Sequence, residues 1–160
     1  MKLTELEFTE LVQQHKGTIY TVCFMFAEDA AEADDLFQDV LVNLWRGLKD
    51  FRAESAEATW VWRVALNTCI SQQRKKRKRN FVSLSMESNF FEDNDEEARQ
   101  VRLLHERIHR LQPFDRAIVL LWLENLSYED IAAIVGITVK NVSVRLVRIR
   151  EQLKRMSNPE

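Results

Sequence analysis

The chain has 160 residues, with 23 Lys and Arg against 25 Asp and Glu, and only three Gly, two Pro and two Cys. So few turn residues exclude most sheet folds, which need a turn about every 8–12 positions, and two isolated cysteines exclude a disulfide framework. The few Gly and Pro therefore predict an all-helical protein, and the isolated cysteines fit a reducing cytoplasm. No apolar run approaches the ~18 residues of a membrane span, the start of the chain is not expected to be a signal peptide, and a formal net charge of -2 argues against a simple basic nucleic-acid binder.

Three helices are predicted in the first of two expected domains, residues 1–80. The first starts at Thr4, with Glu7 in the position of a capping-box partner. The second covers residues 30–48, a polar loop follows over 49–59, and the third covers 60–78 and is wholly basic at its end. Apolar residues at helical spacing are expected in the core: Phe8, Leu11, Val12, Ile19, Val22, Cys23, Phe26, Ala33, Phe37, Val40, Leu41, Leu44 and Leu48.

An acidic linker is predicted over residues 81–97, followed by a second small helical domain over 98–160. Its first helix ends before Pro113 and has one apolar face: Val101, Leu104, His105, Ile108 and Leu111. An almost wholly apolar helix covers residues 114–123, and two shorter helices cover 127–135 and 139–156. The linker has no clean period, although some of its apolar residues can dock on a domain: Phe81, Val82, Leu84, Phe90 and Phe91.

The neutral total charge hides four blocks of alternating sign. Residues 28–39 and 87–97 are acidic, whereas 74–79 and 140–155 are basic. Such blocks are typical of interaction surfaces, with solvated helix faces as the alternative. We expect the second acidic block to mask the basic surfaces in the free protein.

Residues 127–155 have the pattern of a helix-turn-helix. Ser127 and Thr138 are suitable N-caps, and Gly136 suits the left-handed end of the first helix. The inward residues would be Ile131, Ala132, Val135, Val142, Leu146, Ile149 and Leu153. The opposite face can contact bases and phosphates in the major groove through Lys140, Asn141, Ser143, Val144, Arg145 and Arg148. The alternative is a plain helical hairpin with solvated charges.

The third helix has a second candidate nucleic-acid face. Arg63, Asn67 and Arg74 share one side of it and lead into the basic run RKKRKR, which can hold phosphates. A solvated Asn67 is the alternative, and the basic run can also be a localisation signal. Trp60 and Trp62 can either stack on unpaired bases or lie in the core.

Catalysis and metal binding find little support in the sequence. Asp35 and Asp39 are four residues apart but lack a candidate nucleophile, so they either stabilise the helix start or recruit a basic partner. His105 and His109 lack a third metal ligand. We therefore expect no enzyme, no catalytic residue, no metal site, no cofactor and no small-molecule substrate.

Three segments in order resemble bacterial sigma factors of the extracytoplasmic-function (ECF) type, over about residues 8–153. They are DDLFQDVLVNLWR, WVWRVALNTCISQQRKKRKR and RLQPFDRAIVLLWLENLSYEDIAAIVGITVKNVSVRLVRIREQL. The resemblance implies that residues 1–80 are sigma region 2 and residues 98–160 are sigma region 4. It also implies that the partners are core RNA polymerase, through its β′ clamp helices and β subunit, promoter DNA and an anti-sigma factor.

The resemblance also implies roles for residues. Those that would bind core polymerase are Asp34, Asp35, Leu36, Gln38, Asp39, Leu44 and Trp45. Those that would bind the minus-ten element are Arg63, Asn67, Arg74, Lys75, Arg77 and Lys78. Those that would bind the minus-thirty-five element are Thr138, Lys140, Asn141, Ser143, Val144, Arg145 and Arg148. Four sites depart from the usual residues of the family, so the promoter sequence cannot be copied from relatives: Ser71, Lys140, Asn141 and the pair Ser143–Val144.

The predicted function is that of an alternative sigma factor, which binds core polymerase, selects promoters and helps melt the minus-ten element. A conventional transcriptional regulator, dimeric on a palindromic site, is the second possibility. A signalling enzyme with a DNA-binding tail is the third, disfavoured because the first 100 residues have no nucleotide-binding loop or nucleophile–base pair.

Overall fold

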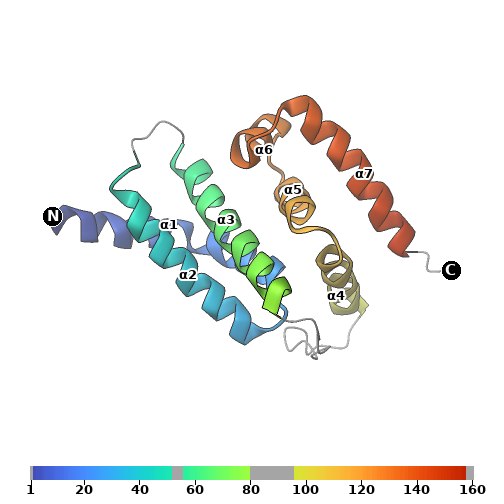
Figure 1. Cartoon of the computed structure of the whole chain (residues 1–160), viewed down its shortest axis with the longest axis horizontal. Helices are drawn as coiled ribbons and strands as arrows, with labels where there is room; N and C mark the ends of the chain where they lie inside the picture. Colours follow the sequence, from blue (N-terminus) through green and yellow to red (C-terminus); the bar gives the residue numbers. More distant parts are fainter. Residues whose placement is uncertain (1, 52–55, 80–95, 158–160) are drawn as a thin grey trace. The chain divides into compact units, whose positions relative to one another are not determined.

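A computed structural model describes residues 2–51, 56–79 and 96–157. These residues form seven α-helices and no strand, which confirms the all-helical prediction (Figure 1). The chain separates into two compact units, Met1–Ser88 and Asn89–Glu160. No helix in the described ranges is long and apolar enough to cross a membrane.

The first unit contains α1 (Lys2–Phe26), α2 (Ala30–Leu48) and α3 (Glu57–Arg79), and each helix packs against the other two. α2 and α3 lie side by side and run in opposite directions (Figure 1). Their shared core consists of fully buried apolar side chains at helical spacing: Ile19, Val22, Cys23, Phe26, Val40, Leu44, Val61, Ala65 and Cys69. This core fixes which faces of α2 and α3 remain at the surface.

The start of α2 is held by its own acidic residues. The Asp29 side chain accepts a hydrogen bond from the Glu32 amide at 2.8 Å, and the Glu32 carboxylate accepts one from the Glu28 amide at 2.8 Å. These reciprocal bonds satisfy amides that a helix start leaves unpaired. The predicted bounds of α2 are confirmed.

The loop predicted over residues 49–59 is too long. α3 starts at Glu57, because the Trp60 amide already donates a helical hydrogen bond to the Ala56 carbonyl at 3.1 Å. α1 likewise starts at Lys2, before the predicted Thr4. Helix ends depend on such local bonds, which polar composition alone does not indicate.

The second unit contains α4 (Glu96–His109), α5 (Pro113–Leu123), α6 (Tyr128–Val135) and α7 (Val139–Ser157). α5, α6 and α7 pack against one another around the buried centre of α5, residues 116–121. The predicted caps are present: the Asp130 amide donates to Ser127 Oγ and the Asn141 amide donates to Thr138 Oγ1, each at 3.1 Å. Gly136 ends α6 with a φ of 79°, the left-handed conformation that favours glycine.

Two predictions of buried residues are wrong in this unit. His105, Ile108 and Leu111 are buried as predicted, but Val101 and Leu104, predicted on the same face, are 50% and 40% exposed. In α6 the buried position belongs to Ile134, at 5% exposure, and Val135 is only partly buried. An apolar pattern gives the period of a helix but fixes its rotation only to within about a residue. The linker residues Phe81, Val82, Leu84, Phe90 and Phe91 lie outside the described residues, as does most of the second acidic block.

Candidate functional surfaces

One side of α2 is exposed along its length and changes from acidic to apolar. Asp34, Asp35 and Gln38 are exposed, and Val42 and Trp45 follow at 46% and 40% exposure. Steps of three and four residues place these side chains on one helix face, which we call the α2 outer face. Trp45 meets the ring of Phe8 edge to face, with centroids 5.2 Å apart, so α1 holds it in place. This face can bind a partner that offers both donors and an apolar contact.

Two of the predicted polymerase-binding residues do not lie on this face. Leu36 is 4% exposed and Leu44 is fully buried, so both hold α2 in the core of the unit and are not available to a partner. In this structure the two leucines therefore contribute to the core of the unit and not to its surface. Asp39 is partly buried, and its carboxylate accepts a hydrogen bond from Gln72 of α3 at 3.1 Å. Val42 is the surface residue that the sequence reasoning missed.

A polar groove of about 590 Å³ runs between α2 and α3. Its lining has two cations, Arg46 and Lys75, and one carboxylate, Asp39. The other residues are apolar or can donate or accept hydrogen bonds: Val42, Asn43, Val64, Asn67, Thr68, Ser71 and Gln72. Asn43 donates to Thr68 Oγ1 at 2.8 Å, which fixes the floor of the groove. Asn67, one of the predicted minus-ten residues, is exposed at its side. Cations and amides together suit a nucleic-acid strand.

The basic side chains at the end of α3 have two different environments. Arg74 and Lys75 are exposed, whereas Lys76 turns back to the start of α2 and pairs with Glu32 at 3.3 Å and Glu28 at 3.4 Å. Partial burial opposes the charged form of Lys76, but the two carboxylates outweigh it and raise the pKa of Lys76 above its usual value. Lys76 thus ties α3 to the start of α2, whereas the exposed Arg74 and Lys75 can bind phosphate. Arg63 lies partly buried on the same helix, and the side chains of Arg77 and Lys78 lie outside the described part.

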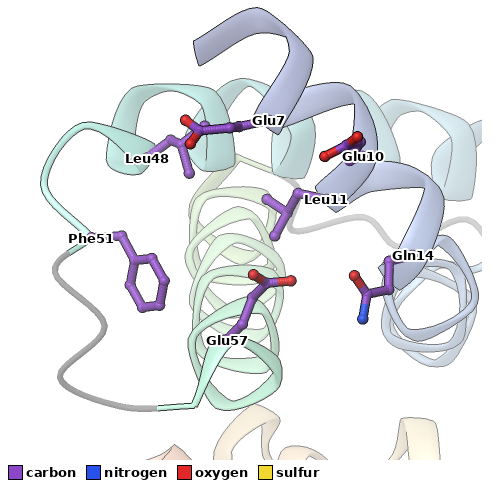
Figure 2. Close-up of a pocket in the computed structure, with 7 residues that line it drawn as sticks. All are labelled: Glu7, Glu10, Leu11, Gln14, Leu48, Phe51 and Glu57. Atoms are coloured by element: carbon purple, nitrogen blue, oxygen red, sulfur yellow. The ribbon is translucent and has the colours of Figure 1, made fainter. Parts of the chain in front are cut away.

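A second hollow in this unit has the opposite charge. Figure 2 shows its seven lining residues, three of which are carboxylates: Glu7, Glu10, Leu11, Gln14, Leu48, Phe51 and Glu57. Glu57 also pairs with His15 of α1, with Oε2 2.8 Å from Nε2. Three carboxylates disfavour a phosphate backbone, so of these two hollows the α2–α3 groove is the one suited to nucleic acid.

The two tryptophans at the start of α3 belong to the packing of the unit. Trp62 is 8% exposed, and Trp60 stacks on Phe51 with centroids 4.7 Å apart. A Cβ added at Gly47 would lie 3.2 Å from Trp60, which shows how closely α2 covers this ring. Of the two alternatives left open for these rings, the structure therefore supports the core.

The second unit presents the outer face of α7. Val142, Leu146 and Ile149 are buried as predicted, and the far side exposes Lys140, Asn141, Val144, Val147 and Arg148, which we call the α7 outer face. Ser143 is partly buried, and Thr138 caps the helix. Cations, an amide and apolar side chains on a helix can read phosphates, base edges and thymine methyl groups in a major groove. Val147, at 59% exposure, also belongs to this face, although the sequence pattern did not place it there.

Arg145 differs from its neighbours on α7. Its Nη1 lies 3.0 Å from Asp115 Oδ1, and its guanidinium lies 4.9 Å from the centre of the Phe114 ring. These two contacts hold the Arg145 side chain against α5, at the margin of the α7 outer face.

No group of three metal-binding side chains occurs among the described residues. Cys23 and Cys69 are both buried, and a hydrogen bond between the thiols, together with burial, raises the pKa of Cys69 well above its usual range. Such thiols are unreactive.

Comparison with known proteins identifies both units. The family model of sigma-70 region 2 matches residues 11–79, and that of sigma-70 region 4 matches residues 102–153. The chain is 30% identical to the RNA polymerase sigma-H factor of Pseudomonas aeruginosa, over 95% of this chain and 86% of that protein. It is 31% identical to the ECF RNA polymerase sigma-E factor of Haemophilus influenzae, over 78% and 74% of the two chains. Its fold is similar to that of the sigma factor RpoE of Bartonella quintana, solved in complex with the anti-sigma factor NepR. That match has a TM-score of 0.73 and 21% identity, and it covers 96% of this chain and 98% of RpoE.

Proposed function

We infer the function from the family: the chain belongs to the RNA polymerase sigma factors of the ECF type. It is an alternative sigma factor, a protein that directs core RNA polymerase to particular promoters. One observation carries the finer assignments. The exposed polar surfaces lie on the units that match region 2 and region 4: the α2 outer face and the α2–α3 groove on one, the α7 outer face on the other.

The α2 outer face is the proposed binding site for the β′ clamp helices of core polymerase. It keeps the polar residues Asp34, Asp35 and Gln38 and the exposed Trp45, and it adds Val42. Asp39 acts at its edge, through the bond to Gln72 that ties α2 to α3.

The α2–α3 groove and the basic end of α3 form the proposed minus-ten surface. Asn67 contacts an unpaired base there, and the surrounding cations hold phosphates: Arg63, Arg74, Lys75, Arg77 and Lys78. The α7 outer face is the proposed reader of the minus-thirty-five duplex, with Ser143, Thr138 and Arg145 at its margin.

Membership of the family also leads us to propose domain roles, a location and a regulator for this protein. Residues 1–80 act as region 2, 81–97 as a linker and 98–160 as region 4. The protein acts in the cytoplasm without a cofactor or a small-molecule substrate, and it catalyses no reaction itself. An anti-sigma factor controls it, as the complex of the similarly folded RpoE with NepR supports.

Binding to core polymerase tests the function and the α2 outer face together. Replacing Asp35 and Gln38 by Ala removes two polar contacts from the centre of that face, and we expect affinity to fall about tenfold or more. The matched control is the Glu10→Ala, Gln14→Ala variant, which makes the same chemical change on α1 and should bind normally. The measurement is titration of labelled chain with purified core polymerase. A wild-type chain that does not bind contradicts the function, and equal affinity of the two variants contradicts the assignment of the face.

A further inference from the structure

The contact between Arg145 and α5 restricts one DNA-facing side chain. Asp115 and Phe114 both lie in the first turn of α5, and they meet the guanidinium through an ion pair at 3.0 Å and a cation–π contact at 4.9 Å. The Asp115 side chain is 23% exposed, and that of Arg145 is 41% exposed. Arg145 is thus held on one side and open on the other.

A held arginine reads DNA differently from a mobile one. An arginine with free rotamers can reach several phosphates, which raises affinity for any sequence. A guanidinium fixed by a carboxylate and a ring keeps its remaining N–H groups in one direction, so it can contact a base edge at a low entropic cost. The exposed Lys140 and Arg148 on the same helix suit the first role, and Arg145 suits the second.

We propose that Asp115, with the Phe114 ring behind Arg145, is a positioning residue that sets which base pair of the upstream promoter element Arg145 reads. The inference rests on the proposed function of α7. It adds to the helix-turn-helix a residue from outside it, on α5, that determines specificity without touching DNA.

Asp115 also has an ordinary structural role, which the test must separate. An acid in the first turn of a helix stabilises the helix dipole, and Asp115 stands third in α5. Asp130 stands third in α6, also in the first turn, so Asp130→Asn removes the same charge from the equivalent position of another helix. It is the matched control for Asp115→Asn.

The experiment uses holoenzyme assembled from core polymerase and the full chain. Wild-type holoenzyme first selects sites from a duplex DNA library with a randomised segment. The ratio of its affinity for the selected site to that for a scrambled site is then measured at one salt concentration. Asp115→Asn should lower this ratio about three- to tenfold, a part of the discrimination that one good arginine–base contact provides. Affinity for the scrambled site should hold or rise, because a negative charge is lost near the phosphates.

The decisive readout is the dependence on Arg145. In an Arg145→Ala background, Asp115→Asn should no longer change the ratio, and Asp130→Asn should leave it unchanged in either background. An unchanged ratio in the Asp115→Asn holoenzyme overturns the inference, and so does an equal fall with and without Arg145. Failure of the wild-type holoenzyme to select any site contradicts the proposed function instead, and the inference falls with it.

Discussion

Val42 and Leu44 are two residues apart on α2 and have opposite roles. Val42 is 46% exposed on the α2 outer face, and Leu44 is fully buried between the three helices. Helical spacing predicted Leu44 in the core, whereas the resemblance to relatives placed Leu44 and Leu36 among the partner contacts and omitted Val42. The polar candidates Asp34, Asp35 and Gln38 were predictable as surface residues because burying an unpaired charge or amide is costly.

Substitutions at these two positions should separate stability from binding. Leu44→Ala leaves a cavity in the core and should lower the free energy of unfolding by about 2–5 kcal/mol. Val42→Ser should change it by less than about 0.5 kcal/mol, as exposed positions usually do, yet weaken polymerase binding. The measurement is urea unfolding, monitored by tryptophan fluorescence in a Trp122→Phe background. The signal then reports on the first unit, because the remaining tryptophans all belong to it: Trp45, Trp60 and Trp62. A stable Leu44→Ala chain would contradict the core position of Leu44.

Lys76 should make the first unit sensitive to high pH. Its pairs with Glu32 and Glu28 are partly exposed, so Lys76→Met should cost less than about 1 kcal/mol near neutral pH. Because the folded chain raises the pKa of Lys76, the contribution is complete below the ordinary value of 10.5 and is lost as pH rises through the folded-state pKa. Unfolding free energies of wild type and Lys76→Met should therefore converge at high pH. Lys75→Met, at the exposed neighbouring position, is the control, and a wild-type advantage that persists at high pH would contradict the pairing.

At the scale of the elements, the caps of the helix-turn-helix were the most predictable features. Ser127, Thr138 and Gly136 each fill a position that few residue types fill well, so the turn of the helix-turn-helix could be assigned without a structure. The start of α3 has no such signal, so the polar composition of its first turn predicts a loop. In α4 the apolar period predicted the burial of Ile108, but it could not show that Val101 and Leu104, which continue the same period, lie outside the core.

The cap and the turn of α6 should contribute measurably to the second unit. Ser127→Ala removes the hydrogen bond to the Asp130 amide and should lower stability by about 0.5–2 kcal/mol. Gly136→Ala should lower the free energy of unfolding by about 1–2 kcal/mol, because alanine is strained at a φ of 79°. No steric clash adds to this cost, since a Cβ at this position would meet nothing within 4 Å. Native-state hydrogen exchange should show faster exchange in peptides of α5–α7, with peptides of α1–α3 as the internal control. Unchanged exchange in α6 would contradict this account of the turn.

At the scale of the whole molecule, acidic and basic surfaces occur on one chain whose net charge is close to zero. Acidic residues face outward on α2, and cations line the α2–α3 groove and the α7 outer face. Composition alone pointed away from nucleic acid, whereas the order of the charges along the chain and the helix-turn-helix pattern predicted DNA-binding surfaces. The hydrogen bonds that set each surface, such as Asp39 with Gln72 and Asp115 with Arg145, join residues about 30 positions apart and could not be predicted from local pattern.

The central claim is that this one chain gives core polymerase a promoter preference. Core polymerase is incubated with fragmented genomic DNA of the host bacterium, with and without the chain, and the 5′ ends of the transcripts are sequenced. We expect the chain to create a small set of start sites that share a minus-ten and a minus-thirty-five element, and these starts to disappear with the Asp35→Ala, Gln38→Ala variant. The same start sites with and without the chain would contradict the account.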